Sequence, residues 1–178
     1  PDIDKNIQII YDDGDLIIVN KPANLPVIPS GKYYYNTLHT IMKENLNCNI
    51  NMLNRIDRET SGCVVMSRGH ELASKFCSMH SKNNSNKIKK TYIAIVENAK
   101  NIEDNFIVEG YLEEIGNIFY RRYQILNKDI ENIKDIKDIK NKNLKYSKTK
   151  FKTLKRIGDY AIVMARLYTG RMHQIRVH

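Results

Sequence analysis

The sequence lacks the features that mark three other classes of protein. No apolar run approaches the ~20 residues that a membrane-spanning helix needs, and eight glycines and four prolines are too few for a collagen-like chain. The three cysteines, Cys48, Cys63 and Cys77, are widely spaced and form no C-x-x-C pair, so neither a disulfide scaffold nor a zinc knuckle is expected. We interpret them as free thiols, buried or half-buried, in an intracellular, reducing compartment. The sequence does not distinguish the cytoplasm, the nucleus and an organelle.

Length and composition predict one globular domain. The chain has 178 residues, of which 42% are hydrophobic and 28% are charged. A chain of this size buries most of the apolar surface that its unfolded state exposes. We therefore expect a single soluble domain over residues 1–178.

The chain is basic, with 29 lysines and arginines, 20 acidic residues and a formal net charge of +9. Such an excess favours a nucleic-acid partner, because lysine and arginine neutralise phosphates. The excess is uneven, since residues 127–155 carry ten lysines and four acidic residues. Within this stretch isoleucine recurs at every third position, a period that keeps to no single face of a helix or a strand. We interpret residues 127–145 as a low-complexity insertion that carries no chemistry.

Strand and turn signals open the chain. Residues 7–11 and 16–20 are apolar runs on either side of Asp12-Asp13-Gly14-Asp15. An Asp-Gly pair supplies the backbone conformations that a tight hairpin needs, so we expect these two runs to pair. Three prolines between residues 21 and 29 then predict an extended loop rather than a central strand.

Helices are few in the remainder of the chain. Thr37 is a candidate N-cap for a first helix, and a second helix fits residues 70–80 with Leu72, Phe76 and Met79 facing inward. Predicted strands occupy residues 63–67, 89–97, 106–112, 118–125, 146–156 and 160–168. A mixed, mostly antiparallel sheet flanked by a few helices defines the α+β class rather than a doubly wound α/β sheet.

The segment N-R-I-D-R-E-T-S-G at residues 54–62 gathers polar residues directly before an apolar strand. Its aspartate, Asp57, lies between Arg55 and Arg58, and two guanidinium neighbours favour the ionised carboxylate. An ionised, partly desolvated aspartate is a usable nucleophile, and Ser61-Gly62 supplies a tight backbone to present it. A surface turn with local ion pairs accounts for the same residues without any chemistry.

The segment K-K-T-Y-I-A-I-V at residues 89–96 is predicted to be a strand that carries Tyr92 on the same face as Ala94 and Val96. If this face lines a cleft, the flat ring of Tyr92 is a surface on which a nucleic-acid base stacks. A tyrosine that only fills the core of a sheet fits the strand pattern equally well.

The segment Y-T-G-R-M-H-Q-I-R-V-H at residues 168–178 joins the end of a strand to a polar run that we expect to open a helix. Arg171 and Arg176 are suited to grip phosphates or to pair with a carboxylate in bidentate fashion. His173 and His178 are five residues apart and do not share a helix face, so metal binding is not expected. A helix start with solvated charges is the alternative without a function.

Together these segments resemble the RluA-like RNA pseudouridine synthases. Residues 54–62 are similar to the family's catalytic motif H-R-L-D-x-x-T-S-G, and residues 90–96 to its K-x-Y-x-A-x-V strand. Residues 169–178 match T-G-R-x-H-Q-I-R-V-H nearly residue for residue, and residues 10–22 resemble E-D-x-x-L-x-V-x-N-K-P. The four blocks occur in the family's order and span nearly the whole chain, which makes coincidence less plausible than for any single motif.

The resemblance implies a pseudouridine synthase-like bent sheet and an enzyme that isomerises uridine in RNA without a cofactor. Asp57 falls at the position of the essential catalytic carboxylate, and Tyr92 at that of the base-stacking tyrosine. Arg176 falls where an arginine pairs with the catalytic aspartate and holds it in place. Arg55 falls at the position that fills the space left when the target nucleotide flips out of the RNA stack.

Further residues are assigned to the RNA partner. We expect Arg58, Arg171, His173 and Lys21 to contact the RNA together with Arg55. We expect ribosomal or transfer RNA as the partner, no metal, no membrane and a monomer. Sequence does not identify the target uridine, because recognition in RNA depends on shape and flanking nucleotides.

Two departures from the family pattern stand out. Asn54 occupies the position of the motif's histidine. The family usually continues with more sheet and helix beyond the last motif, so we expect the 178 residues to be part of a longer catalytic domain. A catalytically inactive RNA-binding module of the same fold is the alternative function, although it would not need Asp57, Tyr92 and Arg176.

Overall fold

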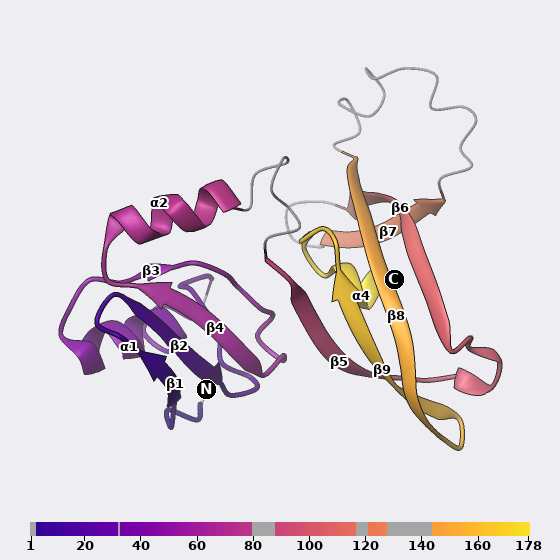
Figure 1. The fold of residues 1–178 in the computed structure, drawn as a ribbon, viewed down its shortest axis with the longest axis horizontal. Helices are drawn as coiled ribbons and strands as arrows, with labels where there is room; N and C mark the ends of the chain where they lie inside the picture. The colour runs from indigo at the N-terminus through magenta and orange to yellow at the C-terminus, as the bar shows by residue number, and fades with distance from the viewer. Residues whose placement is uncertain (1–2, 32, 80–87, 117–120, 128–143) are drawn as a thin grey trace. The chain divides into compact units, whose positions relative to one another are not determined.

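The computed structural model describes residues 3–31, 33–79, 88–116, 121–127 and 144–178. The chain divides into two compact units, Pro1–Asn84 and Ser85–His178 (Figure 1). The single catalytic domain expected over the whole chain stays a prediction, and most of the insertion expected at residues 127–145 lies outside the described residues.

Unit 1 is a four-stranded sheet with two helices. The strand order is β1-β2-β4-β3, and every neighbouring pair is antiparallel. The helix α2 packs against β3 and β4 (Figure 1). In chain order the elements are β1 (Gln8–Asp12), β2 (Leu16–Lys21), α1 (Leu38–Leu46), β3 (Asn51–Met52), β4 (Gly62–Ser67) and α2 (His70–Met79).

The hairpin predicted at the start of the chain is confirmed by the pairing of β1 with β2. Gly14 in its turn has φ 96°, a left-handed conformation that favours glycine. The carboxylate of Asp13 accepts hydrogen bonds from the backbone N–H groups of Asp15 at 3.0 Å and Leu16 at 2.7 Å. These bonds fix the turn before β2 enters the core.

The helix α1 closes the core of unit 1. The predicted N-cap is confirmed, because Thr37 Oγ1 accepts a hydrogen bond from the N–H of Thr40 at 3.2 Å. Leu38, Ile41 and Met42 face inward and are buried. They join a core cluster whose other buried members are Ile17, Val19, Leu25, Val27, Ile50, Val64 and Met66.

Two expectations for side chains of unit 1 are wrong. Leu72 and Phe76 of α2 are half-buried, but Met79 is 40% exposed because it is the last residue of the helix.

The cysteines are free thiols as predicted, yet Cys63 and Cys77 are exposed and only Cys48 is half-buried. Cys63 precedes the buried Val64 on β4 and points to the opposite face, as the period of a strand requires. Cys77 lies on α2, which buries none of its residues fully.

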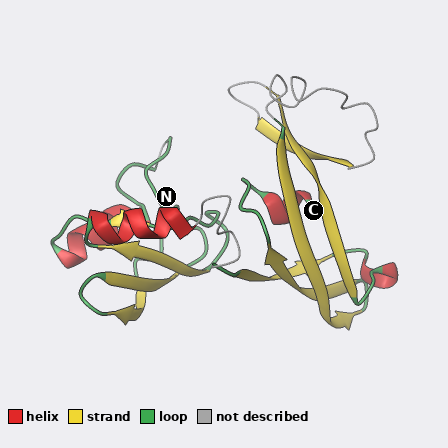
Figure 2. Ribbon diagram, turned by 45° about the horizontal axis from the view of Figure 1, so that its top comes forward, coloured by secondary structure: helices red, strands yellow, loops and turns green. Residues whose placement is uncertain are grey.

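Unit 2 is a five-stranded antiparallel sheet in the order β5-β9-β8-β6-β7. Figure 2 shows that strands dominate this part of the chain. In chain order its elements are β5 (Lys90–Val96), the 3-10 helix η1 (Ala99–Asn101), β6 (Asn105–Gly116), β7 (Arg121–Asn127), β8 (Lys145–Ile157), β9 (Tyr160–Leu167) and α4 (Gln174–Val177).

One face of this sheet forms the core of unit 2. Phe151 of β8 and Ala161, Val163 and Ala165 of β9 are buried there, and Ile175 of α4 packs against them. The ring of Phe106 on β6 stacks on that of Phe151, with 4.9 Å between the ring centroids. The alternate residues of β8 and β9 point to the opposite face, because neighbouring side chains in a strand point to opposite sides.

The α+β class and the mostly antiparallel pairing are confirmed. Each predicted strand is found, with ends shifted by a few residues. The first three residues of the strand predicted at 118–125 lie outside the described residues. Sequence reasoning missed the two-residue strand β3 and the helix η1, which are too short to carry a periodic signal. Among the described residues, no helix is long and apolar enough to cross a membrane.

Candidate active site

Asp57 lies in the loop that joins β3 to β4 and is half-buried. Its carbonyl oxygen accepts a hydrogen bond from the N–H of Thr60 at 3.1 Å, which folds the loop into a turn. Gly62 then starts β4 with φ 122°, a conformation that other residues rarely adopt. The glycine at the end of the motif is thus required by the backbone that leads from the loop into the sheet.

The side chain of Asn54 ties the Asp57 loop to β4. Its Oδ1 atom accepts a hydrogen bond from the N–H of Val65 at 2.7 Å, and its Nδ2 atom donates one to the carbonyl of Cys63 at 3.4 Å. The side-chain amide of Asn54 therefore bonds to two residues of the strand. The residue that departs from the family motif has a clear positioning role in this chain.

The buried ammonium group of Lys21 also bonds to this loop. Its side chain has no exposed surface, and Nζ donates hydrogen bonds to the carbonyls of Pro22 at 2.7 Å, Leu25 at 2.8 Å and Arg58 at 3.0 Å. Burial lowers the pKa of Lys21 to about 8, while the negative charges of Glu59 and Asp57 act in the opposite direction. Lys21 thus joins the proline-containing loop to the Asp57 loop.

The buried position of Lys21 is unsuited to a direct contact with RNA. A lysine that neutralises a phosphate must reach solvent, whereas all three donor positions of Lys21 are used inside unit 1. The sequence prediction treated Lys21 as a surface cation because the motif alone does not reveal burial. The structure instead favours a role for Lys21 in positioning the Asp57 loop.

The two arginines beside Asp57 are exposed. The guanidinium group of Arg58 donates to the carboxylate of Glu59 at 2.8 Å and to the hydroxyl of Tyr33 at 2.6 Å. These hydrogen bonds raise the pKa of Arg58, and its guanidinium also lies over the Tyr33 ring. Arg55 extends from the same loop. Both cations remain accessible to an anionic partner.

Tyr92 lies on β5 opposite Ala165 of β9 and is half-buried. Together with Ala94 and Val96 it packs against the core cluster of unit 2. The predicted alternation of β5 is confirmed, since Ile93 and Ile95 on the other face are 63% and 73% exposed. Part of the Tyr92 ring therefore fills the core, as the alternative interpretation required, and part of it remains accessible.

Gln174 organises the last motif, a role that sequence reasoning missed. It is only 2% exposed. Its Oε1 atom accepts hydrogen bonds from Thr169 Oγ1 at 2.8 Å and from the N–H of Arg171 at 3.0 Å. Its Nε2 atom donates to the carbonyl of Lys148 at 3.1 Å and to Thr149 Oγ1 at 2.9 Å. The sequence shows a glutamine that follows a Thr-Gly turn and precedes an apolar residue, but it does not show that this glutamine is buried.

The short helix α4 presents Arg176 at the surface of unit 2. It begins at Gln174, directly after His173, which adopts a left-handed φ of 53°. Arg171 lies outside the helix and donates from Nε to the carbonyl of Tyr146 at 2.8 Å. Burial, and secondarily the charge of Arg171, lower the pKa of the neighbouring Lys90.

The predicted site residues thus fall into two groups. Lys21, Arg55, Asp57 and Arg58 belong to unit 1, and the second group, Tyr92, Arg171, His173 and Arg176, belongs to unit 2. Within unit 1 the Asp57 loop, Lys21 and Asn54 form one bonded assembly. The meeting of Asp57 with Tyr92 and Arg176 stays a prediction.

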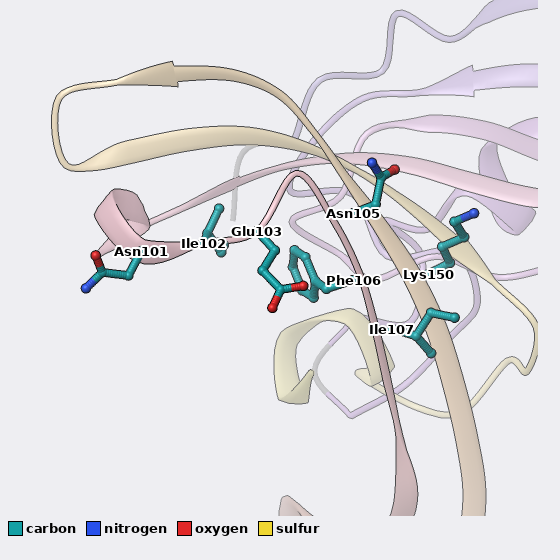
Figure 3. A pocket seen from close by; sticks show the side chains of 7 residues that line it. All are labelled: Asn101, Ile102, Glu103, Asn105, Phe106, Ile107 and Lys150. Carbon is teal, nitrogen blue, oxygen red and sulfur yellow. The ribbon is translucent and has the colours of Figure 1, made fainter.

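A cavity of about 700 Å³ in unit 2 is separate from these residues. Figure 3 shows that the polar ends of Asn101, Glu103 and Lys150 point away from one another rather than toward a common centre. Its lining residues are Asn101, Ile102, Glu103, Asn105, Phe106, Ile107 and Lys150. No predicted site residue lines it. The described residues contain no cluster of three or more histidine, cysteine or acidic side chains that would hold a metal ion.

The chain belongs to the RNA pseudouridylate synthase family, whose model matches residues 15–178. It is 30% identical over 178 residues to the mitochondrial tRNA pseudouridine(32) synthase of Saccharomyces cerevisiae, covering 100% of this chain and 35% of that protein. It is 30% identical over 172 residues to the ribosomal large subunit pseudouridine synthase C of Buchnera aphidicola, covering 96% of this chain and 49% of the relative. The predicted membership of the RluA-like group is thereby confirmed.

A solved structure supports the fold. Human RNA Pseudouridylate Synthase Domain Containing 1 matches with a TM-score of 0.74 and 19% identity, over 100% of this chain and 66% of that one. At this identity the likeness concerns the fold alone. The chain spans only about a third to a half of the length of the yeast and Buchnera relatives.

Proposed function

We propose that this chain is the catalytic part of an RNA pseudouridine synthase, which isomerises uridine to pseudouridine in structured RNA by base flipping. The observation that carries the proposal is the family match over residues 15–178, which includes Asp57, Tyr92 and Arg176. The support that Asn54 and Lys21 give to the Asp57 loop is consistent with a carboxylate whose position matters. No cofactor is required, since the reaction rearranges bonds within one nucleotide.

In the proposed reaction the bond between N1 of uracil and C1′ of ribose breaks. The base turns, C5 bonds to C1′, the proton on C5 is released to solvent, and N1 takes up a proton from solvent, so that the product is an isomer of the substrate. Asp57 is the essential carboxylate, and Arg176 pairs with it to hold it in place. Tyr92 stacks on the flipped base and assists the removal of the C5 proton.

Three exposed arginines and the half-buried His173 contact the RNA. Arg55 fills the space of the flipped nucleotide, while Arg58, Arg171 and His173 contact phosphates or the flanking nucleotides. For Lys21 we propose a positioning role, because it is buried. The yeast relative is named for transfer RNA and the Buchnera relative for the ribosomal large subunit, so the proposal extends to RNA and not to one class of it.

Release of tritium from RNA labelled at uridine C5 tests the proposal. The full-length protein that contains this chain is incubated with labelled transfer and ribosomal RNA transcripts. We expect release by the unchanged protein and at least a 10³-fold loss in Asp57→Asn, because removal of an essential group typically costs this much or more. The affinity for RNA should change little, since the amide has the same shape as the carboxylate.

Asp159→Asn is the matched control, because Asp159 lies in the β8–β9 turn and its carboxylate bonds to Lys100. It should release tritium at the normal rate. If Asp57→Asn keeps its turnover, Asp57 loses its role. If the unchanged protein binds RNA but releases no tritium from any transcript, the inactive RNA-binding module is the better account.

A further inference from the structure

The outward face of β8 is a row of lysines. Lys148, Lys150 and Lys152 alternate with buried residues of the same strand, and Lys155 rejoins the row after an irregularity between Thr153 and Lys155. Successive residues of such a row lie about 6.6–6.8 Å apart. Four cations on one face of a central strand concentrate positive charge on that side of the sheet.

The neighbouring strands add one cation and one carboxylate to this face. Lys150 lies directly opposite Arg166 of β9, an arrangement that destabilises a sheet because like charges face each other. The lysine at the start of the row, Lys148, forms an ion pair with Glu109 at 2.8 Å. The residues paired with the other four cations on the neighbouring strands are not acidic: Ile107, Asn105, Met164, Ile162 and Thr91.

An aromatic ring lies at the end of this row. The guanidinium group of Arg166 is 5.5 Å from the centroid of the Tyr168 ring, and the ammonium group of Lys148 is 6.0 Å from it. Tyr168 is 37% exposed. Cations beside an accessible aromatic ring provide phosphate contacts and a stacking surface together, a combination typical of surfaces that bind single-stranded nucleic acid.

We propose that Lys150, Lys152, Lys155 and Arg166, here called the lysine face, bind the phosphate backbone of the RNA substrate outside the active site. The proposal rests on the proposed function, because the family supplies RNA as the occupant. The repulsion between Lys150 and Arg166 is relieved when a phosphate lies between them. Phosphate contacts position a nucleic acid without reading its sequence.

The lysine face lies on the other side of the sheet from the residues assigned to catalysis in unit 2. Tyr92 packs on the core side, against which Ile175 of α4 also packs, whereas Lys150 and Lys152 are exposed on the outer side. Loss of the lysine face should therefore weaken RNA binding without changing the chemical step.

The test compares two variants of the full-length protein that have equal net charge. One carries Lys150→Gln, Lys152→Gln and Lys155→Gln. The control carries Lys43→Gln on α1, Lys75→Gln on α2 and Lys100→Gln on η1, which are exposed lysines outside the face. The affinity for an unmodified transfer RNA transcript is measured as a function of salt. For the first variant we expect an affinity loss of about tenfold and a salt slope lower by about 2, from three lost phosphate contacts.

The control should stay within about twofold of the unchanged protein, and a variant with arginine at positions 150, 152 and 155 should keep the normal affinity. At saturating RNA, the rate of tritium release should be the same in all of these variants.

If the glutamine variant binds RNA as tightly as the control, or the arginine variant binds as weakly as the glutamine variant, the lysine face is not an RNA surface. Either result leaves tritium release by the unchanged protein intact, so the proposed function would stand. Conversely, if the glutamine variant loses affinity selectively but the unchanged protein releases no tritium, the lysine face is an RNA surface and the proposed enzymatic function is wrong.

Discussion

The ammonium group of Lys21 donates a hydrogen bond to the carbonyl of Arg58 at 3.0 Å, directly beyond the candidate catalytic residue Asp57. The end of β2 and the loop before β4 are thereby joined inside unit 1, although 37 residues separate them in the sequence. A lysine is suited to this role because its three N–H donors reach three carbonyls at once. The position of the Asp57 loop therefore depends on a buried charge outside the loop.

Replacement of Lys21 by methionine tests this dependence. The methionine has a similar length but leaves three carbonyls without their donor, so we expect the free energy of unfolding to fall by about 3 kcal/mol. Urea unfolding measures the change, and tritium release should fall with it. Lys43→Met on the exposed surface of α1 is the control and should have little effect. An equally stable Lys21→Met protein would show that the three hydrogen bonds do not hold the loop.

Asn54 provides a second test of the same loop. Asn54→Ala removes both hydrogen bonds to β4, and we expect an unfolding free energy lower by about 1–2 kcal/mol and a lower kcat with little change in KM. Asn49→Ala is the control, since Asn49 is exposed. Asn54→His introduces the residue of the family motif and should retain more activity than alanine. A normal kcat in Asn54→Ala would remove Asn54 from the positioning of Asp57.

Gln174 is the corresponding anchor of unit 2. Gln174→Glu keeps the acceptor atom for Thr169 and Arg171 but replaces the donor that faces the carbonyl of Lys148. A buried carboxylate beside a carbonyl is unfavourable, so we expect thermal unfolding at a lower temperature and a stability loss of about 2–3 kcal/mol. Gln8→Glu on the exposed strand β1 is the matched control. Equal melting temperatures for the two variants would contradict the proposed anchor.

The ion pair of Asp12 with Arg68 predicts a dependence of stability on pH. Two hydrogen bonds, at 2.6 and 2.7 Å, join the groups, and those from Arg68 are the main reason why the pKa of Asp12 falls to about 2 from its ordinary value of 3.8. Because the folded pKa is the lower one, the stabilisation is complete above about pH 4 and disappears as the pH falls through 2. Urea unfolding of Asp12→Asn should show a deficit at pH 7 that vanishes near pH 2.

Asp15→Asn serves as the reference for that series, since the side chain of Asp15 makes no hydrogen bond among the described residues. Its difference from the unchanged protein should not follow the same pH profile. A deficit of Asp12→Asn that persists undiminished at pH 2 would mean that the ion pair is not its source.

The fold was largely predictable because its signals are local. The Asp-Gly turn, the N-cap Thr37 and the alternation of β5 each depend on a few neighbouring residues, and each was found as expected. The continuation of β6 beyond residue 112 was missed, because it depends on pairing with β7 from Gly110 to Gly116. Cys63 is exposed because it precedes the buried Val64 on β4 and therefore points to the opposite face. The composition of the chain does not reveal this register.

The candidate site was only partly predictable for a related reason. A motif names residues but not their burial, so Lys21 was assigned to RNA and Gln174 received no role. Both are buried and bonded to backbone or side-chain groups of other elements. The role of Asn54 was equally hidden, because its partners on β4 come later in the chain. Pairing over long sequence distances is decided by tertiary packing, which one sequence encodes only indirectly.

We propose that Asp57, Tyr92 and Arg176 line one cavity that accepts a single flipped uridine. A crystal structure of the full-length protein tests this arrangement through the distance between the Asp57 carboxylate and the Arg176 guanidinium. We expect an ion pair within about 4 Å, with the Tyr92 ring facing the same cavity. Side chains on separate surfaces, with no shared cavity, would overturn the proposal.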